Sequence, residues 1–331
     1  MCEQQYFLEY VLGFSGPSGQ KADKGTIVHK ILEILAVIKK AQQDNHKTIT
    51  DDIVGLISTE SYDLTDIIQQ VYTHYSTHAP HHKWTPKDHK DCSNWTHKAL
   101  EFNSGMFDPR NRNILCPEQK FDLEITKPWA KYCYDTPQGK IEGYLAIKGT
   151  IDLITQVNDK TIEIIDWKTG KRRDWATGQE KTLEKLQQDP QLKMYHYAIS
   201  RIYPHIEHII FSIYFINDGG PFSICFDKSD LASTEDMLRR KFALIQNSNK
   251  PRLKKSWMCT KLCNFGKTTF DKTSLLPILE YREGQVCKQG EFMTKCEQIK
   301  HEIDTKGMEQ TLVECTNPTH SIGNYKAPGS I

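Results

Sequence analysis

The chain has 331 residues and a formal net charge of only +1, with 43 lysines and arginines against 42 acidic residues. This balance excludes a protein that coats nucleic acid through bulk positive charge, so any such contact must be local. No apolar run approaches the roughly 18 residues of a membrane span, and no secretory signal is recognisable, so we expect a soluble, cytoplasmic protein without membrane contact. The ten cysteines are then expected to be free or metal-bound thiols.

The first predicted element is a helix that begins at Asp23 or Gly25. His29 lies off its apolar stripe, and two interpretations stay open for it: an ordinary surface histidine, or a metal ligand. Glu33 follows one helical turn later, where it could accept a hydrogen bond from the imidazole or make a simple surface contact. The apolar positions recur at helical spacing and are Ile27, Ile31, Ile34, Leu35 and Ile38.

Residues 48–107 separate this helix from the strands that follow. Helical periodicity predicts a helix from Asp52 to Tyr75, with Leu56 among its buried positions. The histidine-rich tract at residues 74–97 has irregular spacing and two prolines, which favours a solvated loop. The alternatives are a metal-binding tract, or a cap in which Trp84, Trp95 and lysines contact single-stranded nucleic acid.

Two strands are predicted next, at residues 144–157 and 160–168, joined by a tight turn at Asn158 and Asp159. The hairpin brings Asp152 towards Asp166. Because side chains alternate along a strand, Asp166 and Lys168 share a face at the strand end. Carboxylate oxygens are preferred ligands of Mg²⁺ and Mn²⁺, and a neighbouring ammonium suits a phosphate, so this arrangement predicts phosphodiester hydrolysis.

Glu118 begins a probable strand ahead of this hairpin, either as part of the site or as an ordinary charge at a strand edge. After the hairpin, Lys171 to Arg173 form a basic turn that is either a solvated face or a phosphate contact. A short helix is predicted at residues 180–188. Asp189 and Pro190 then start a helix that places Gln191 and Tyr195 on one face. Strands at 207–217 and 222–227 and a helix at 230–246 follow, and no Walker-type phosphate loop occurs.

Four motifs together resemble the PD-(D/E)XK nuclease superfamily, and within it the RecB-type, exonuclease V-like branch. They are Gly25 to His29, Gly149 to Asp152, Asp166 to Lys168 and Gln191 to Tyr195, in the order of that family. The resemblance implies an α/β, restriction-endonuclease-like core with a mixed central sheet flanked by helices. It also implies that His29, Asp152, Asp166 and the carbonyl of Trp167 hold Mg²⁺ or Mn²⁺, that Lys168 is the catalytic lysine, and that Gln191 and Tyr195 orient the substrate.

The cysteines resemble those of iron-sulfur nucleases in the same branch, where one cysteine precedes the histidine motif and three follow the core. Cys2, Cys259 and Cys263 fit three of these positions, and Cys287 is taken as the fourth, with Cys296 as the alternative. The resemblance implies a 4Fe-4S cluster. Structural Zn²⁺, which could also involve Cys315 and His320, and unliganded buried thiols stay open.

From these patterns we expect one nuclease core at residues 1–250, with a helical insertion at about 48–110, and a cysteine-containing region at 251–331 that packs back on the N-terminus. The predicted function is a metal-dependent DNA exonuclease acting on ends or single strands in recombination, repair or replication. A helicase or recombination protein is a candidate partner. The alternatives are a structure-specific or restriction-type endonuclease, and a DNA-end binding module without catalysis.

Overall fold

The computed structural model describes residues 2–14, 20–79, 82–136, 139–173, 178–247, 250–261, 263, 265–266 and 294–316. The chain divides into two compact units, which are treated separately below. The larger unit comprises Ser18–Ile125 and Ala146–Arg239. The smaller unit comprises Met1–Pro17, Thr126–Leu145 and Arg240–Ile331.

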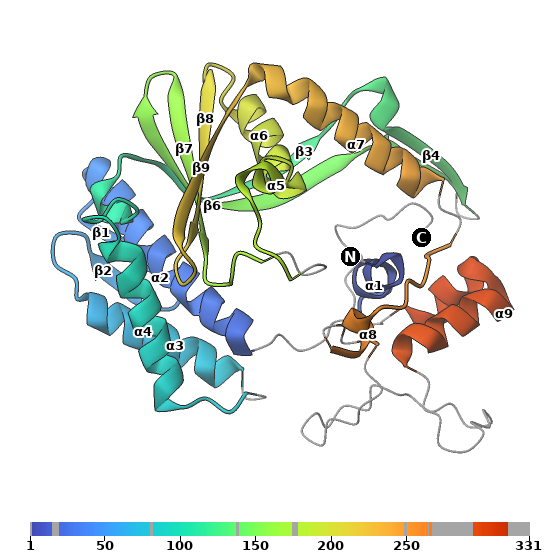
Figure 1. Cartoon of the computed structure of the whole chain (residues 1–331), viewed down its shortest axis with the longest axis horizontal. Coiled ribbons are helices and arrows are strands. Elements are labelled where there is room, and N and C mark those ends of the chain that lie inside the picture. Colours follow the sequence, from blue (N-terminus) through green and yellow to red (C-terminus); the bar gives the residue numbers. More distant parts are fainter. Residues whose placement is uncertain are drawn as a thin grey trace. The chain divides into compact units, whose positions relative to one another are not determined.

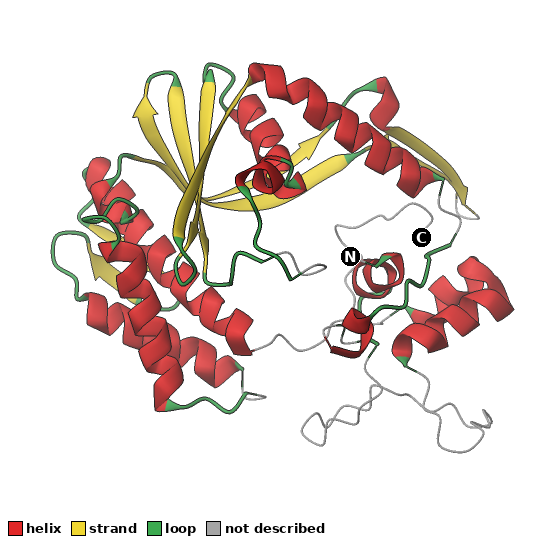
Figure 2. Ribbon diagram, viewed as in Figure 1, coloured by secondary structure: helices red, strands yellow, loops and turns green. Residues whose placement is uncertain are grey.

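A five-stranded mixed sheet forms the centre of the larger unit, in the order β3-β6-β7-β8-β9 (Figure 1). Only β7 and β8 run parallel, and the other neighbours are antiparallel. Figure 2 shows helices on both sides of this sheet. The expected α/β core with a mixed sheet flanked by helices is therefore confirmed. The strands are β3 (Ile114–Glu124), β6 (Ala146–Asn158), β7 (Thr161–Lys168), β8 (His208–Phe215) and β9 (Gly220–Asp227).

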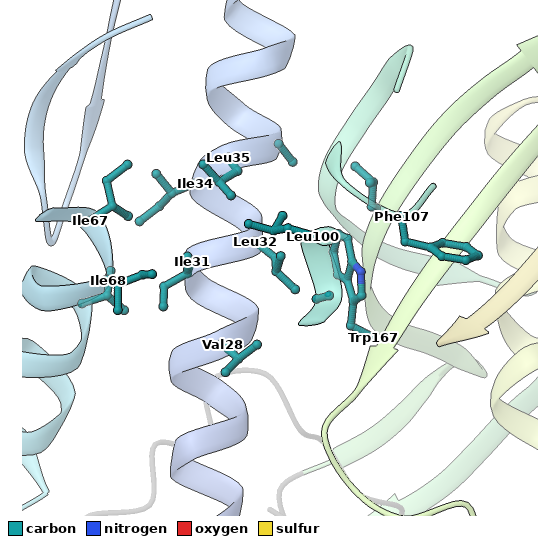
Figure 3. Close-up of a cluster of buried hydrophobic side chains, with 14 of the residues drawn as sticks. Val28, Ile31, Leu32, Ile34, Leu35, Ile67, Ile68, Leu100, Phe107 and Trp167 are labelled. Carbon is teal, nitrogen blue, oxygen red and sulfur yellow. The ribbon is translucent and has the colours of Figure 1, made fainter. Parts of the chain in front are cut away.

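Helix α2 (Gln20–Gln43) is the longest element and supplies much of the core. Its isoleucines and leucines are buried, as the helical spacing predicts, and they pack with Leu100, Phe107 and Trp167 (Figure 3). Gly25 sits where the helix meets the end of β7. A Cβ atom at this position would lie only 2.7 Å from Oγ1 of Thr169, so the close approach requires glycine.

The helix expected from Asp52 to Tyr75 is wrong over its first half. A hairpin of β1 (Thr48–Asp51) and β2 (Gly55–Ser58) occupies that region. The carboxylate of Asp51 accepts the N–H groups of Ile53 and Val54, and Gly55 adopts a φ of +78°, which closes a tight turn. Leu56, expected to be buried, is 75% exposed. The helix α3 (Leu64–His78) begins only after this hairpin.

The solvated loop expected at residues 74–97 is also wrong, because helix α3 extends to His78 and helix α4 (Pro86–Glu101) covers the second half of the tract. Thr85 and Asp88 form a reciprocal capping box at its start, with proline in the first turn. Cys92, Ala99 and Leu100 then face the core. The tryptophans expected in a cap, Trp84 and Trp95, instead pack against the hydrophobic core and are only partly exposed. A short helical turn η2 (Pro109–Asn111) leads to β3.

The connection from β7 to β8 carries α5 (Leu183–Gln187) and α6 (Pro190–Ile202). Asp189 caps α6 as predicted, because its carboxylate accepts the N–H of Gln191 at 2.9 Å. After β9, the turn η4 (Lys228–Asp230) leads into α7 (Leu231–Gln246). These bounds agree with the predicted strands and helix to within a few residues. Helix α6 packs against β6, which brings Tyr195 beside Phe121 of β3.

The smaller unit contains a hairpin and a group of short helices around a separate core. Helices α1 (Glu3–Tyr6) and η1 (Phe7–Val11) pack with α9 (Lys295–Cys315), which is bent at Gly307. The remaining elements are η3 (Pro128–Ala130), β4 (Lys131–Thr136), β5 (Gly139–Tyr144) and α8 (Trp257–Lys261). Over the described residues, no helix combines the length and apolar composition needed to cross a bilayer.

Candidate active site and cysteine pocket

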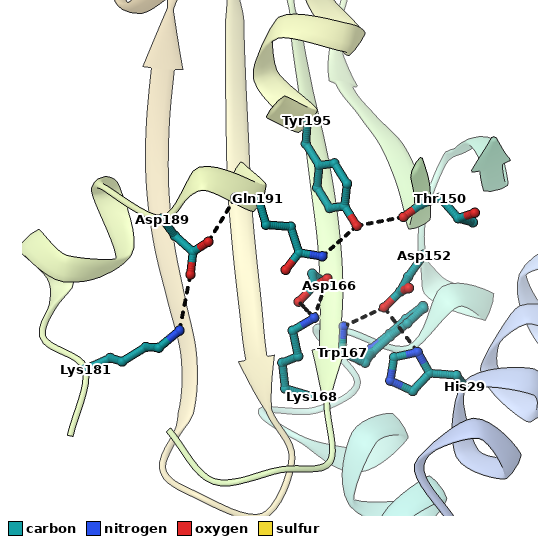
Figure 4. A network of polar contacts seen from close by, with 10 residues as sticks. All are labelled: His29, Thr150, Asp152, Asp166, Trp167, Lys168, Lys181, Asp189, Gln191 and Tyr195. Carbon is teal, nitrogen blue, oxygen red and sulfur yellow. Dashed lines mark hydrogen bonds and ion pairs between the residues drawn. The ribbon is translucent and has the colours of Figure 1, made fainter. Parts of the chain in front are cut away.

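Strand pairing brings the two predicted carboxylates together in the larger unit. Leu153 of β6 pairs with Ile165 of β7, so the next residues along the two strands, Asp152 and Asp166, lie across from each other. Oδ2 of Asp152 accepts the backbone N–H of Trp167 at 3.0 Å (Figure 4). The indole of Trp167 is buried in the core and fixes this part of β7. The role of its carbonyl as a metal ligand stays a prediction.

Asp166 and Lys168 form a close ion pair. Nζ of Lys168 lies 2.9 Å from Oδ1 and 2.7 Å from Oδ2 of Asp166. Burial raises the pKa of Asp166; the ammonium of Lys168 acts against this and the charge of Asp152 adds to it. Burial lowers the pKa of Lys168, but the two carboxylates outweigh it and hold this pKa above its ordinary value. Lys168 therefore remains an ammonium group at neutral pH.

His29 reaches the same group from helix α2. Its Nδ1 lies 3.3 Å from Oδ2 of Asp152, and its side chain is 29% exposed. Burial lowers the pKa of His29, but the hydrogen bond and charge of Asp152 more than compensate, so the pKa is raised. The carboxylate of Glu33 does not accept a hydrogen bond from the imidazole of His29. It pairs instead with the ammonium of Lys30 at 2.9 Å. The structure thus brings His29, and not Glu33, to the carboxylates.

Gln191 and Tyr195 form a short hydrogen-bond chain that ends on strand β6. Nε2 of Gln191 donates to the Tyr195 hydroxyl at 2.7 Å, and this hydroxyl donates to the carbonyl of Thr150 at 2.7 Å (Figure 4). Tyr195 is buried, which raises the pKa of its phenol to about 12. The structure brings both residues beside the carboxylates, and their role in orienting substrate stays a prediction. The contact with Thr150, two residues before Asp152, was not foreseen.

Glu118 belongs to this neighbourhood, although the sequence left its role open. Pro117 pairs with Leu153 and Gln119 with Ile151, which puts Glu118 across from Asp152. Its backbone adopts a φ of +47°, an uncommon conformation for this residue type. Burial, followed by the charges of Glu33 and Asp152, raises the pKa of Glu118 to about 7. No sequence pattern predicts the positive φ of Glu118 or its position across from Asp152.

In the basic turn at residues 171–173, the side chain of Arg172 is already occupied by contacts within the protein. The guanidinium of Arg172 pairs with Glu180 at 2.7 Å and stacks on Phe222 at 4.2 Å from the ring centroid. Its backbone N–H donates to Asp218 at 2.6 Å. Arg172 is thus used to hold the loop after β7, and the structure gives no support to a phosphate contact by this side chain.

The donor atoms of the site suit a hard divalent ion, but the side chains do not stand in coordination geometry. Among the described residues, no three histidine, cysteine or acidic side chains are grouped closely enough to hold a metal ion. Lys168 covers both oxygens of Asp166, and Oδ2 of Asp152 is shared by His29 and Trp167. Two carboxylates and one imidazole nevertheless match the ligand preferences of Mn²⁺, and the carboxylates those of Mg²⁺. A metal ion bound at Asp166 would therefore share its carboxylate with Lys168 or displace the ammonium.

Four cysteines line one pocket in the smaller unit. This cavity of 720 Å³ is bordered by Cys2, Cys259, Cys263 and Cys296, and all four thiols are free of disulfides. Burial raises the pKa of the Cys296 thiol to about 12, and the other three cysteines add to this shift. Four thiols are the ligand type of an iron-sulfur cluster or zinc, but in the described structure these thiols are not grouped closely enough to hold a metal ion. Cys287 and His320, named from the sequence as ligands, lie outside the described residues.

Two strand carboxylates with a lysine beside them are the arrangement of a metal-dependent nuclease, in which charge on a phosphodiester is met by metal and ammonium. The comparison with protein families agrees with this class. The family model of the PD-(D/E)XK nuclease superfamily matches residues 1–267, and the chain belongs to that superfamily. No curated protein matches the sequence.

Proposed function

We propose that this protein is a metal-dependent DNA exonuclease that hydrolyses phosphodiester bonds at ends or along single strands, in recombination, repair or replication. The observation that carries the proposal is the convergence of Asp152, from the middle of β6, with Asp166 and Lys168, at the end of the paired strand β7. End processing is favoured by the resemblance of the Gln191 to Tyr195 helix to RecB-type nucleases. A helicase or recombination protein is proposed as the partner of this nuclease.

Each residue of the site has a separate role in the proposed reaction. Asp152 and Asp166, with His29, would hold Mg²⁺ or Mn²⁺, which when bound supplies Lewis-acid polarisation of the scissile phosphate. Lys168, released from Asp166, would place its ammonium against the negative charge that develops on the phosphate. Within the described residues the side-chain oxygen of Gln191 accepts no hydrogen bond, and it would face the substrate while the side-chain nitrogen donates to Tyr195.

The test compares end-labelled linear single-stranded DNA with a circle of the same length and sequence, with Mg²⁺ or Mn²⁺, for wild type and Lys168→Ala. Loss of only the linear DNA with wild type, and of neither DNA with the variant, is the expected result. Cutting of the circle would support the endonuclease instead. Metal-independent binding of ends without any cutting would support a binding module. The same assay with RNA strands of matching sequence tests whether cleavage depends on the sugar.

We further propose that the cysteine pocket holds a 4Fe-4S cluster, with structural Zn²⁺ as the alternative. Cys2, Cys259 and Cys263 keep the roles expected from the sequence. For the fourth ligand we favour Cys296, because it lines the same pocket and is buried. Measuring iron, sulfide and zinc in protein purified without oxygen distinguishes the two groups, and a metal-free preparation of full stability would exclude both.

A further inference from the structure

A basic and aromatic segment, residues 252–258, runs along one border of the cysteine pocket. Lys254, Lys255 and Met258 line the pocket, whereas Trp257 does not and is 53% exposed. Between Asn247 and Cys263 the sequence contains no acidic residue. It contains five basic ones: Lys250, Arg252, Lys254, Lys255 and Lys261. The segment therefore presents an exposed indole among positive charges.

The backbone of this segment is held from two sides. The N–H of Arg252 donates to the carboxylate of Glu3 at 2.9 Å, and the thiol of Cys2 donates to the carbonyl of Arg252 at 3.6 Å. Lys255 pairs with Glu297 of α9 at 2.9 Å. Because these contacts use the backbone of Arg252 and not its guanidinium, its side chain stays available to a ligand. The segment is thus anchored while its outward side chains remain exposed.

The charges of Arg252 and Lys254 are not neutralised within the part of the chain that the structure describes. No acidic group of the described residues pairs with either side chain, and both residues are exposed. By contrast, Lys250 pairs with Asp304 at 3.1 Å. Two exposed cations that precede an exposed indole by five and three residues suit a strand that offers both phosphates and bases.

A second exposed aromatic pair lies on the helices that contribute Cys2 and Gln5 to the same pocket. The rings of Tyr6 and Tyr10 have centroids 5.0 Å apart, and the residues are 41% and 40% exposed. Their planes differ by 31°, so they present two nearly parallel faces. Exposed aromatic faces accept unstacked bases, which only a single strand offers freely.

We infer that the surface formed by Arg252, Lys254 and Trp257, extended by Tyr6 and Tyr10, binds single-stranded nucleic acid. Bases stack on the indole and phenol rings, and the guanidinium and ammonium groups contact phosphates. The inference rests on the proposed function in one respect, namely that such a strand is the substrate of the nuclease site. A protein partner matches Lys254 less well, because lysine is depleted from the buried core of protein interfaces.

The test measures binding of a fluorescent 30-nucleotide thymidine strand by anisotropy, using the full chain in EDTA so that no cleavage occurs. Trp257→Ala should weaken binding by about 5- to 150-fold, the range for losing one base stack, while Trp257→Phe retains most of the affinity. Lys254→Ala should lower the slope of log affinity against log salt by about 0.7. Lys241→Ala, at an exposed position in α7, is the matched charge control and should change neither quantity.

Four outcomes decide whether this surface binds single-stranded nucleic acid. Equal affinity of wild type and Trp257→Ala, with an unchanged melting temperature, overturns the inference. Equal losses for Lys254→Ala and Lys241→Ala overturn it as well, because they indicate diffuse charge attraction. Weaker binding by Trp257→Ala, together with wild-type cleavage of a nitrophenyl ester of thymidine monophosphate, supports it, since the nuclease site is then intact. If wild type binds the strand through Trp257 but cleaves nothing, the proposed function fails while this surface stands.

Discussion

The ammonium group of Lys168 contacts both carboxylate oxygens of Asp166, at 2.9 and 2.7 Å. Asp166 is only 4% exposed, so this lysine is the counter-ion of a buried acid. A divalent ion that binds Asp166 would share this carboxylate with Lys168 or displace the ammonium. Lys168 and the metal therefore compete for one carboxylate in the resting protein, although the proposed reaction uses both.

This competition predicts opposite effects of Lys168→Met on binding and on catalysis. Removing the ammonium should increase the affinity for Ca²⁺ or Mn²⁺, measured by calorimetry, because the ion no longer displaces a charge. The cleavage rate should fall by about 10²- to 10³-fold, since a group that stabilises the transition state is lost. Lys160→Met, at an exposed ion pair with Glu207, is the control. Weaker metal binding by the Lys168 variant would contradict this account.

Tyr195 is predicted to act through the position of strand β6 and not by touching substrate. Its hydroxyl is occupied by the carbonyl of Thr150. Tyr195→Phe should therefore lower kcat by about tenfold and leave KM unchanged, with a loss of about 1 kcal/mol in unfolding free energy. Tyr214→Phe removes a similar bond, to the carbonyl of Lys98, and should lower stability alone. A rise in KM for Tyr195→Phe would instead indicate direct contact with substrate.

Gly25 is predicted to be essential because of the close approach of Thr169. In Gly25→Ala the new Cβ would lie 2.7 Å from Oγ1 of Thr169, which should push α2 and His29 away and cost about 1–3 kcal/mol. Thr169→Ala removes that oxygen. The double variant should then regain most of the stability and cleavage lost in Gly25→Ala. Urea unfolding and cleavage assays test this, and additive losses in the double variant would refute the steric explanation.

The raised pKa of Glu118 predicts a pH dependence of stability in the metal-free protein. Because the folded state holds this proton more tightly than the unfolded chain, its contribution is complete below pH 4.5 and is lost as the pH rises through about 7. Glu118→Gln should then stabilise the protein in EDTA at pH 8 by about 1 kcal/mol, after discounting for partial exposure, with no gain at pH 4.5. Glu124→Gln, at the exposed end of β3, is the control. Equal effects at both pH values would exclude the explanation.

Cys296 is predicted to be required for the metal group of the pocket. Cys296→Ala should lose absorbance near 400 nm together with bound iron, and should melt at a lower temperature, because binding of the group is part of folding. Cys133→Ala, at an exposed thiol of β4, should behave as wild type. If Cys296→Ala keeps its iron and Cys287→Ala does not, the fourth ligand is Cys287.

The sequence predicted those elements in which a single pattern, such as apolar alternation or a helix cap, is strong. Alternating apolar residues identified β6 and β7, and Asp189 with Pro190 marked the start of α6. The predictions are wrong where a few local hydrogen bonds determine the secondary structure. The Asp51 carboxylate closes a turn within an apparently helical pattern, and the Thr85 capping box starts a helix in a strongly polar tract. The contact of Tyr195 with Thr150 could not be predicted, because it depends on how α6 packs on the sheet.

The residues of the site lie at very different distances from one another along the chain. Asp152 and Asp166 meet within one hairpin, so their approach needs only a short loop to close. His29 arrives only when α2 docks on the finished sheet, through the closely fitted pair of Gly25 and Thr169. Contacts of large sequence separation tend to form late during folding. Divalent-ion affinity, followed during refolding, would therefore report the docking of α2 as an event separate from formation of the hairpin.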